Sequence, residues 1–311
     1  MEKKVKSKKR RPVISPLSDA PKGKVAAVKA ILSDRKKALT MVIGNQKGGV
    51  KKTTNTYMIA YTLARWGFYT LVVDLDPQSN ITRTLMLTKS RESKDITTID
   101  KTLMRGVQEG YLDDLPVRIM DNLDLLPSFV DFQYFAKFLY RTTSSEYEET
   151  HALDPLFKKL KKRYDFILFD VPPQNVEVTQ NAIVTSDYVL IAMETQQDSY
   201  SGVLSYVKAL AKLKQQYDLP VEVLGILPVL TEHRDKRLAD GGLDPLDKRV
   251  IQAAEDTYGV DNVFTPIPYI KRVKRFPFSG ISVADSYDRR AHLKYEPVVR
   301  SIFDRIIYFE S

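Results

Sequence analysis

Residues 38–66 read ALTMVIGNQKGGVKKTTNTYMIAYTLARW, and this stretch decides the fold. Ala38–Ile43 is a largely apolar, β-prone run, a glycine-rich turn follows it, and the residues up to Trp66 have helical spacing. An unbroken apolar run is typical of a parallel strand that is buried on both faces. A glycine-rich turn between such a strand and a helix offers phosphate its backbone N–H groups and the positive end of the helix dipole. The stretch therefore predicts a phosphate-binding loop in an α/β fold.

Strand and helix patterns alternate through the rest of the chain. The further strands that we predict are Thr70–Val73, Phe166–Phe169, Tyr188–Ala192 and Val221–Leu230, with an edge pair at Val117–Ile119 and Leu123–Leu126. The predicted helices are Ile96–Met104, Phe129–Tyr140, Leu153–Arg163, Tyr200–Gln215, Lys248–Tyr258 and Leu293–Tyr308. This alternation predicts an α/β architecture with a doubly wound, mostly parallel sheet flanked by helices.

The N-terminal segment differs in composition from the rest of the chain. Residues 1–12 carry seven Lys or Arg and one Glu, so most of the net charge of +9 lies there. We predict a basic flexible arm over residues 1–37, with a short helix at Lys24–Asp34, followed by one nucleotide-binding domain over residues 38–311. A basic arm attracts nucleic acid, and the alternative interpretation is a solubilising tail without a partner.

Composition excludes several classes of protein. The chain has no cysteine, which excludes disulfides, thiolate zinc sites and iron–sulfur clusters and indicates a cytosolic protein. Its three histidines, His151, His233 and His292, lie far apart in the sequence and lack the spacing of metal ligands. No apolar run reaches the roughly 18–20 residues that span a bilayer.

The glycine-rich turn departs from the ordinary P-loop pattern. Gly44 and Gly49 have the required separation, but Val50 follows where a lysine should stand. The segment KGGVKKTT at residues 47–54 instead resembles the deviant Walker A loop, K-G-G-x-G-K-[ST]-[ST], of the ParA/MinD family. The resemblance implies a nucleotide-binding segment made of Lys47, Gly48, Gly49, Val50, Lys51, Lys52, Thr53 and Thr54. It also implies that Lys47 reaches the nucleotide of a dimer partner, that Lys52 is the general P-loop lysine, and that Thr53 binds Mg²⁺.

Lys51 is the position that departs from the family pattern, because it replaces the last glycine of the loop. Glycine there lets the backbone approach the phosphates without a Cβ atom in the way. A lysine forces a strained loop at a cost of about 1–3 kcal/mol or obstructs the ligand, and we predict weakened or lost nucleotide binding. The alternative is that Lys51 points into solvent and adds favourable charge.

Carboxylates follow two of the other predicted strands. Asp74 and Asp76 lie in the segment DLDPQ, which resembles the D-x-D-P-Q segment of the same family. The resemblance implies that Asp76 positions or activates the attacking water and that Asp74 supports the Mg²⁺ shell. Asp170 follows an apolar run in the form of a Walker B strand and begins a D-x-P-P segment, which implies a role as a Mg²⁺ ligand, usually through water. The carboxyl ends of parallel strands meet at one edge of a sheet, so we expect these acids to face the phosphate loop.

A segment near the C-terminus indicates the branch of the family. Residues 265–280, TPIPYIKRVKRFPFSG, resemble the T-x-I-P-R-N-V-R-L-S-E-A-P-S-x-G stretch of partition ATPases. The resemblance places Pro268 near the adenine, although Ile270 replaces the usual asparagine. The residues that we predict to bind DNA are Arg272, Lys271, Lys274 and Arg275, joined by Arg234 and Arg237. Such cations neutralise phosphates without reading bases, which predicts salt-sensitive, sequence-tolerant binding.

The resemblance as a whole implies a ParA-like P-loop ATPase over residues 38–311 that partitions DNA. ATP with Mg²⁺ would form a sandwich homodimer, the dimer would bind DNA non-specifically, and a ParB-like centromere-binding protein would stimulate hydrolysis, in the cytoplasm on the nucleoid. One alternative is a MinD-like positioning ATPase, which needs a basic amphipathic C-terminal helix. The apolar stripe over residues 298–307 is interrupted by charges of both signs, so we predict core packing and no membrane contact. The other alternative is a degenerate P-loop protein that regulates without hydrolysis.

Overall fold

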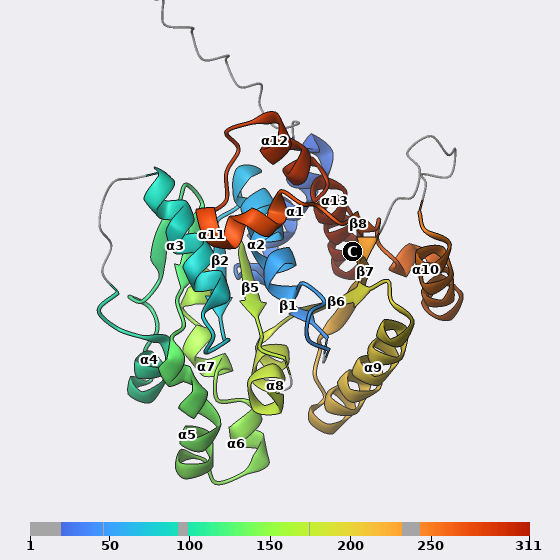
Figure 1. Cartoon of the computed structure of the whole chain (residues 1–311). Helices are drawn as coiled ribbons and strands as arrows, with labels where there is room; N and C mark the ends of the chain where they lie inside the picture. Colours follow the sequence, from blue (N-terminus) through green and yellow to red (C-terminus); the bar gives the residue numbers. More distant parts are fainter. Residues whose placement is uncertain (1–19, 46, 93–98, 174, 232–242) are drawn as a thin grey trace, which may run out of the picture.

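The computed structural model describes residues 20–45, 47–92, 99–173, 175–231 and 243–311. They form an eight-stranded sheet in the order β3–β4–β2–β5–β1–β6–β7–β8, with helices on both faces (Figure 1). Every pairing is parallel except that between β3 and β4, which is antiparallel. The strands are β1 Leu39–Gly44, β2 Thr70–Asp74, β3 Val117–Met120, β4 Leu123–Leu126, β5 Phe166–Asp170, β6 Tyr188–Glu194, β7 Glu222–Thr231 and β8 Ile267–Pro268. The doubly wound, mostly parallel fold is confirmed.

The helices divide into two layers, each with its own core. The layer with α1, α2, α3, α12 and α13 packs on one face of the sheet, and the layer with α4, α5, α7, α8, α9 and α10 packs on the other. Side chains of β1 alternate between the two cores, with Met41 on one face and Val42 on the other, because successive strand residues point in opposite directions. The helices are α1 Lys22–Arg35, α2 Lys52–Arg65, α3 Asn80–Glu92, α4 Leu103–Glu109, α5 Phe135–Thr142, α6 Glu146–Thr150, α7 Asp154–Phe157, α8 Val176–Thr185, α9 Gln197–Tyr217, α10 Pro245–Tyr258, α11 Phe276–Ser279, α12 Ser286–Leu293 and α13 Glu296–Glu310.

Three helix predictions were wrong in extent. The helix expected over Phe129–Tyr140 is divided into a 3₁₀ helix at Val130–Tyr134 and α5. The helix expected over Ile96–Met104 begins only at Leu103, and residues 93–98 lie outside the described residues. The helix expected over Leu153–Arg163 is broken into α7 and a 3₁₀ turn at Leu160–Lys162. The sequence also failed to predict several helices, namely α6, α8, α12 and α3. Of these, α3 borders the site. Its inner face includes Thr84 and Thr88, whose hydroxyls donate to backbone carbonyls one turn back, so apolar periodicity does not reveal it.

The helix within the predicted basic arm is docked on the domain. Val28 of α1 is fully buried, and Arg35 pairs with Asp187 at 2.6 Å and with Glu310 of α13. In α13 the predicted apolar stripe is buried in the core, as expected from its mixed charges. Among the described residues, no helix combines the length and apolarity needed to cross a bilayer.

Candidate nucleotide-binding site

The three segments that the sequence singles out converge because their strands are neighbours. β2, β5 and β1 lie side by side in the sheet, and the phosphate loop follows β1. Asp74 and Asp170 end β2 and β5 and are paired in register across the sheet. Carboxyl ends of adjacent parallel strands open onto the same edge, which is the usual place for a ligand in an open α/β sheet.

A cavity of about 690 Å³ lies at this edge. Of the residues that the sequence assigns to the site, it is lined by Gly48, Gly49, Val50, Lys51, Lys52, Thr53, Thr54 and Asp76. Helix α2 begins against it with no side-chain cap and no acidic residue in its first turn. Its first N–H groups and its dipole are therefore suited to an anion in the cavity.

Lys52 supplies a buried positive charge. Its side chain is only 6% exposed, and its ammonium group donates to the carbonyls of Asn45 at 3.0 Å and Lys47 at 3.2 Å. Burial lowers the pKa of Lys52, and the charges of Asp170 and Asp76 oppose that shift. The Asn45 side chain fixes the loop by accepting from the Lys47 N–H and donating to the carbonyl of Ala192. The Lys52 ammonium group thus joins two carbonyls of the loop and interacts electrostatically with Asp170 and Asp76.

Asp170 is the buried acid of the site. It is 1% exposed, and neither carboxylate oxygen has a hydrogen-bond partner in the part of the chain that the structure describes. Burial raises the pKa of Asp170 well above its usual range, and the nearby Asp74 adds to the shift. The Thr53 hydroxyl approaches closely enough to oppose the shift without completing a hydrogen bond. A buried carboxylate without a partner fits a site that binds a cation.

Mg²⁺ suits this set of donors. Proteins usually bind Mg²⁺ through one or two oxygen ligands together with water and the phosphates of the substrate. Thr53 lines the phosphate cavity and offers a hydroxyl, and Asp170, whose carboxylate interacts with that hydroxyl, offers one carboxylate. Within the described ranges, no group of three or more carboxylates or imidazoles forms a protein-only metal cage. The site therefore fits a metal that arrives with a nucleotide.

Asp74 and Asp76 have different surroundings. Both oxygens of Asp74 are occupied: one accepts from the Asp76 N–H at 3.0 Å, and the other accepts from the N–H and the hydroxyl of Thr82. Burial raises the pKa of Asp74 to about 7. Asp76 lines the cavity, and one of its oxygens accepts from the Gln78 N–H at 2.9 Å. Asp74 thus holds the turn that presents Asp76 to the cavity.

Lys51 has the backbone conformation that glycine favours. It stands directly before α2 with φ 59° and ψ 30°, in the left-handed region. A Cβ atom makes that region costly by roughly 1–2 kcal/mol. The sequence predicted strain at this position, and the positive φ is its structural form. The Lys51 side chain lines the phosphate cavity and also a second, smaller cavity beside it.

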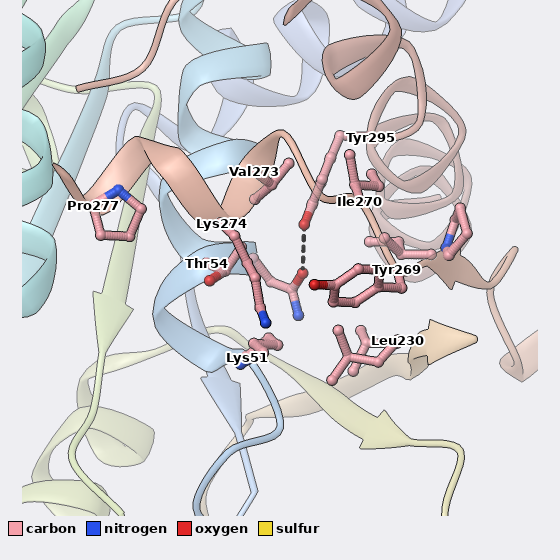
Figure 2. A pocket seen from close by; sticks show the side chains of 13 residues that line it. Lys51, Thr54, Leu230, Tyr269, Ile270, Val273, Lys274, Pro277 and Tyr295 are labelled. Atoms are coloured by element: carbon pink, nitrogen blue, oxygen red, sulfur yellow. Dashed lines mark hydrogen bonds between the residues drawn. The ribbon is translucent and has the colours of Figure 1, made fainter. Parts of the chain in front are cut away.

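The second cavity has a volume of about 140 Å³ and is shown in Figure 2. Pro268, which the sequence places near the adenine, lies in its wall, together with Lys51, Thr54 and Pro277, which also line the phosphate cavity. The remaining wall is formed by Asn55, Val229, Leu230, Ile267, Tyr269, Ile270, Val273, Lys274 and Tyr295. The two cavities therefore adjoin; the phosphate cavity has both polar and apolar lining residues, and the smaller cavity is largely apolar.

The basic segment has one member that carboxylates hold in place. Lys271, Lys274 and Arg275 are exposed, but the Arg272 guanidinium donates to Asp285 at 2.7 Å and to the buried carboxylate of Asp288. The hydrogen bond to Asp288 raises the pKa of Arg272. The two carboxylates hold the Arg272 guanidinium and so fix the position of the segment; its contact with DNA stays a prediction. Arg234 and Arg237, also predicted to bind DNA, lie outside the described residues.

The comparisons with known proteins agree with this geometry. A family model described as an AAA domain matches residues 38–223. The chromosome-partitioning ATPase Soj of Treponema pallidum is 27% identical over 269 residues, which are 86% of this chain and 97% of that protein. The chain belongs to the ParA family of ATPases.

Solved structures share the fold of this ParA-family chain. The ATP complex of a McdA variant from Cyanothece has a TM-score of 0.72 at 19% identity and covers 85% of this chain and 96% of its own. A plasmid partition protein from Borrelia burgdorferi has a TM-score of 0.62 at 19% identity and covers 88% of this chain and 99% of its own. At these identities the likeness concerns the fold alone.

Several residues at the site were not predicted from the sequence of this ParA-family chain. Thr82 orders Asp74 from the first turn of α3, which the apolar pattern did not reveal. Asn55 and Tyr295 lie in the wall of the smaller cavity, and their hydroxyl–amide hydrogen bond joins α2 to the residue before α13. They are 240 positions apart, so no local signal in the sequence could have paired them.

Proposed function

We propose that this chain is a slow ATPase that partitions DNA. The observation that carries the proposal is that a buried lysine of the phosphate cavity, Lys52, interacts electrostatically with the buried carboxylate of Asp170, whose oxygens have no hydrogen-bond partner among the described residues. The triphosphate occupies that cavity, with Lys52 and the N–H groups of α2 against its oxygens. Thr53 and Asp170 hold Mg²⁺, which when bound neutralises charge on the phosphates. Asp76 orients the attacking water, and Asp74 holds Asp76 in place. Phosphoryl transfer requires mainly this kind of placement and charge.

The proposal extends to the wider cycle that the family resemblance implies. ATP drives formation of a sandwich homodimer in which Lys47 contacts the nucleotide of the partner subunit, and a ParB-like centromere-binding protein stimulates hydrolysis. The dimer binds DNA non-specifically in the cytoplasm, on the nucleoid. Support for DNA binding comes from the exposed Lys271, Lys274 and Arg275, which lie beside the smaller cavity or in the same segment. Arg234, Arg237 and the basic N-terminal arm are proposed to extend this surface.

Lys51 lowers the nucleotide affinity in this proposal. Its side chain lines both cavities at their junction, where the ribose and the first phosphate of a nucleotide would cross. A mobile lysine must be displaced or ordered there, at a cost of up to about 2 kcal/mol in side-chain entropy. The same feature favours a second candidate function, that of a P-loop regulator which binds DNA or a partner without turnover.

The test is ATP-dependent DNA binding, measured by fluorescence anisotropy with duplexes of unrelated sequence, together with phosphate release. We expect binding that needs ATP, falls with salt and tolerates any sequence. Lys271→Glu/Arg275→Glu should weaken it about tenfold or more, whereas Lys212→Glu, an exposed lysine in the opposite helix layer, should not.

Three results would direct the assignment elsewhere. Nucleotide binding without hydrolysis, in both the natural chain and Lys51→Gly, would favour the regulator. Co-sedimentation with anionic liposomes in place of DNA would favour a positioning ATPase. DNA binding that is the same with and without ATP would contradict the proposal that ATP controls DNA binding.

A further inference from the structure

The smaller cavity has the size and lining of a site for one planar ring. Its 140 Å³ cannot hold a whole nucleotide, but it adjoins the 690 Å³ phosphate cavity through Lys51, Thr54 and Pro277. Most of its remaining wall is apolar, with Val229, Leu230, Ile267, Ile270 and Val273. Apolar side chains enclose a heterocycle but do not distinguish one hydrogen-bonding edge from another.

One buried polar group in this wall lacks a partner. The Asn55 side chain is 1% exposed, and its Oδ1 accepts a hydrogen bond from the Tyr295 hydroxyl at 3.1 Å, drawn as the dashed line in Figure 2. Its Nδ2 has no hydrogen-bond partner among the described residues. Buried amide donors are almost always satisfied, so an unused one in a cavity wall points to a ligand acceptor.

Tyr295 fixes which end of the amide meets the ligand. Its own side chain is 2% exposed, and its hydroxyl donates to Asn55 Oδ1. This hydrogen bond engages the amide oxygen and leaves the NH₂ group as the free end. At the mouth of the cavity, the Lys274 ammonium lies 5.1 Å from the centre of the Tyr269 ring, which is 46% exposed, so the cavity also has an aromatic face near its opening (Figure 2).

We infer that Asn55 is the base-reading residue of this chain, and that its Nδ2 donates to a ring nitrogen of a purine held in the smaller cavity. Tyr295 is a positioning residue that sets the orientation of the amide. The inference rests on the proposed ATP site and deepens it. It also accounts for a base site in which Ile270 supplies only an apolar surface, since the polar contact comes from α2 instead.

The experiment pairs a protein variant with ligand analogues that lack one ring nitrogen each. Dissociation constants for ATP and its 1-deaza, 3-deaza and 7-deaza analogues are measured by calorimetry with Mg²⁺. The natural chain and Lys51→Gly are compared with the same two backgrounds carrying Asn55→Leu/Tyr295→Phe. The double change removes both hydrogen-bonding groups and keeps an apolar wall of similar volume, so folding is retained. Inorganic tripolyphosphate, which has no base, reports on the phosphate cavity separately.

We expect the double variant to bind ATP about tenfold more weakly and tripolyphosphate equally well. In the chains that keep Asn55 and Tyr295, one deaza analogue should bind about tenfold more weakly than ATP. In the double variant, that analogue and ATP should bind equally well. Tyr295→Phe alone, which keeps the amide but releases its orientation, should give a smaller loss.

Two results would overturn the inference while leaving the ATP site intact. One is equal ATP affinity with and without Asn55. The other is a loss in the double variant that is the same for all three analogues and for tripolyphosphate. Failure of every chain, including Lys51→Gly, to bind either ATP or tripolyphosphate would instead contradict the proposed function itself.

Discussion

Lys51→Gly removes two costs that we assign to this lysine. One is the cost of its left-handed backbone to the stability of the fold, and the other is the cost of its side chain to ATP binding. Its left-handed backbone costs an L-residue roughly 1–2 kcal/mol, and glycine forfeits about 0.5–1 kcal/mol of that gain through its freedom in the unfolded chain. The net expectation is a free energy of unfolding that is higher by about 0.5–1 kcal/mol. The structure holds Lys51 in this conformation as part of the loop itself, so we assign the backbone cost to folding. The lower ATP affinity that we propose then comes from the Lys51 side chain at the junction of the two cavities.

The chain contains a matched control in Lys36. It is an exposed lysine with φ 55° and ψ 23° at the end of α1, close to the φ 59° and ψ 30° of Lys51. Lys36→Gly should therefore give the same gain in stability, since glycine is the preferred residue at such a helix end. Neither cavity includes Lys36 in its described lining, so ATP affinity should not change.

The assay combines urea unfolding with calorimetric titration of ATP and Mg²⁺. Both variants should be more stable by a similar amount, and Lys51→Gly alone should bind ATP about tenfold more tightly, which corresponds to about 1.4 kcal/mol. The positive charge of Lys51 also attracts phosphate, but salt screens that attraction, so the advantage of glycine should grow with ionic strength. Equal ATP affinities for Lys51→Gly and Lys36→Gly at every salt concentration would refute the idea that the Lys51 side chain obstructs ATP binding.

Four further predictions concern the site and its supports. Asp76→Ala should retain ATP binding and lower phosphate release about a hundredfold or more; an unchanged rate would remove Asp76 from the water-handling role. Asp170→Asn should raise the free energy of unfolding without nucleotide by about 1–3 kcal/mol and abolish the extra stability that Mg²⁺ adds to ATP, both readable by thermal melting. Arg272→Ala should lower the free energy of unfolding by about 2–3 kcal/mol because it leaves a buried carboxylate unpaired, whereas Lys271→Ala should affect DNA binding alone. Burial lowers the pKa of His292 to about 4. Between pH 6.5 and 4 the unfolded chain therefore binds an additional proton, and the free energy of unfolding decreases as the pH is lowered through this range. Between pH 7 and 5 this amounts to about 2 kcal/mol in urea unfolding, and His292→Gln should lose that part of the dependence; an identical slope in both proteins would contradict it.

The sequence predicted the parts of the molecule whose signal is local. The glycine and lysine spacing of the loop, the apolar strands and the acids that end them identify the fold and most of the phosphate site. Adjacent parallel strands bring their ends to one edge whatever the rest of the chain does. The polar inner face of α3 was missed for the same reason, because its buried threonines carry no apolar period.

Tertiary structure decided the features that depend on distant partners. Gly280, predicted only as part of a motif, has φ 73°, and a Cβ there would lie 2.6 Å from the backbone of Leu87 and Thr88 in α3. The sequence predicts Arg272 as a DNA contact, and its ion pairs with Asp285 and Asp288 form only once α12 packs nearby.

Asn55 depends in the same way on a partner that is remote in sequence. In the sequence it is an unremarked polar residue of a helix, and it becomes a candidate base reader only because Tyr295 engages one end of its amide. Local periodicity thus set the framework of this protein. The role of each charged or polar side chain was set by the groups that folding placed beside it, since burial and pairing determine whether a polar atom is free to meet a ligand.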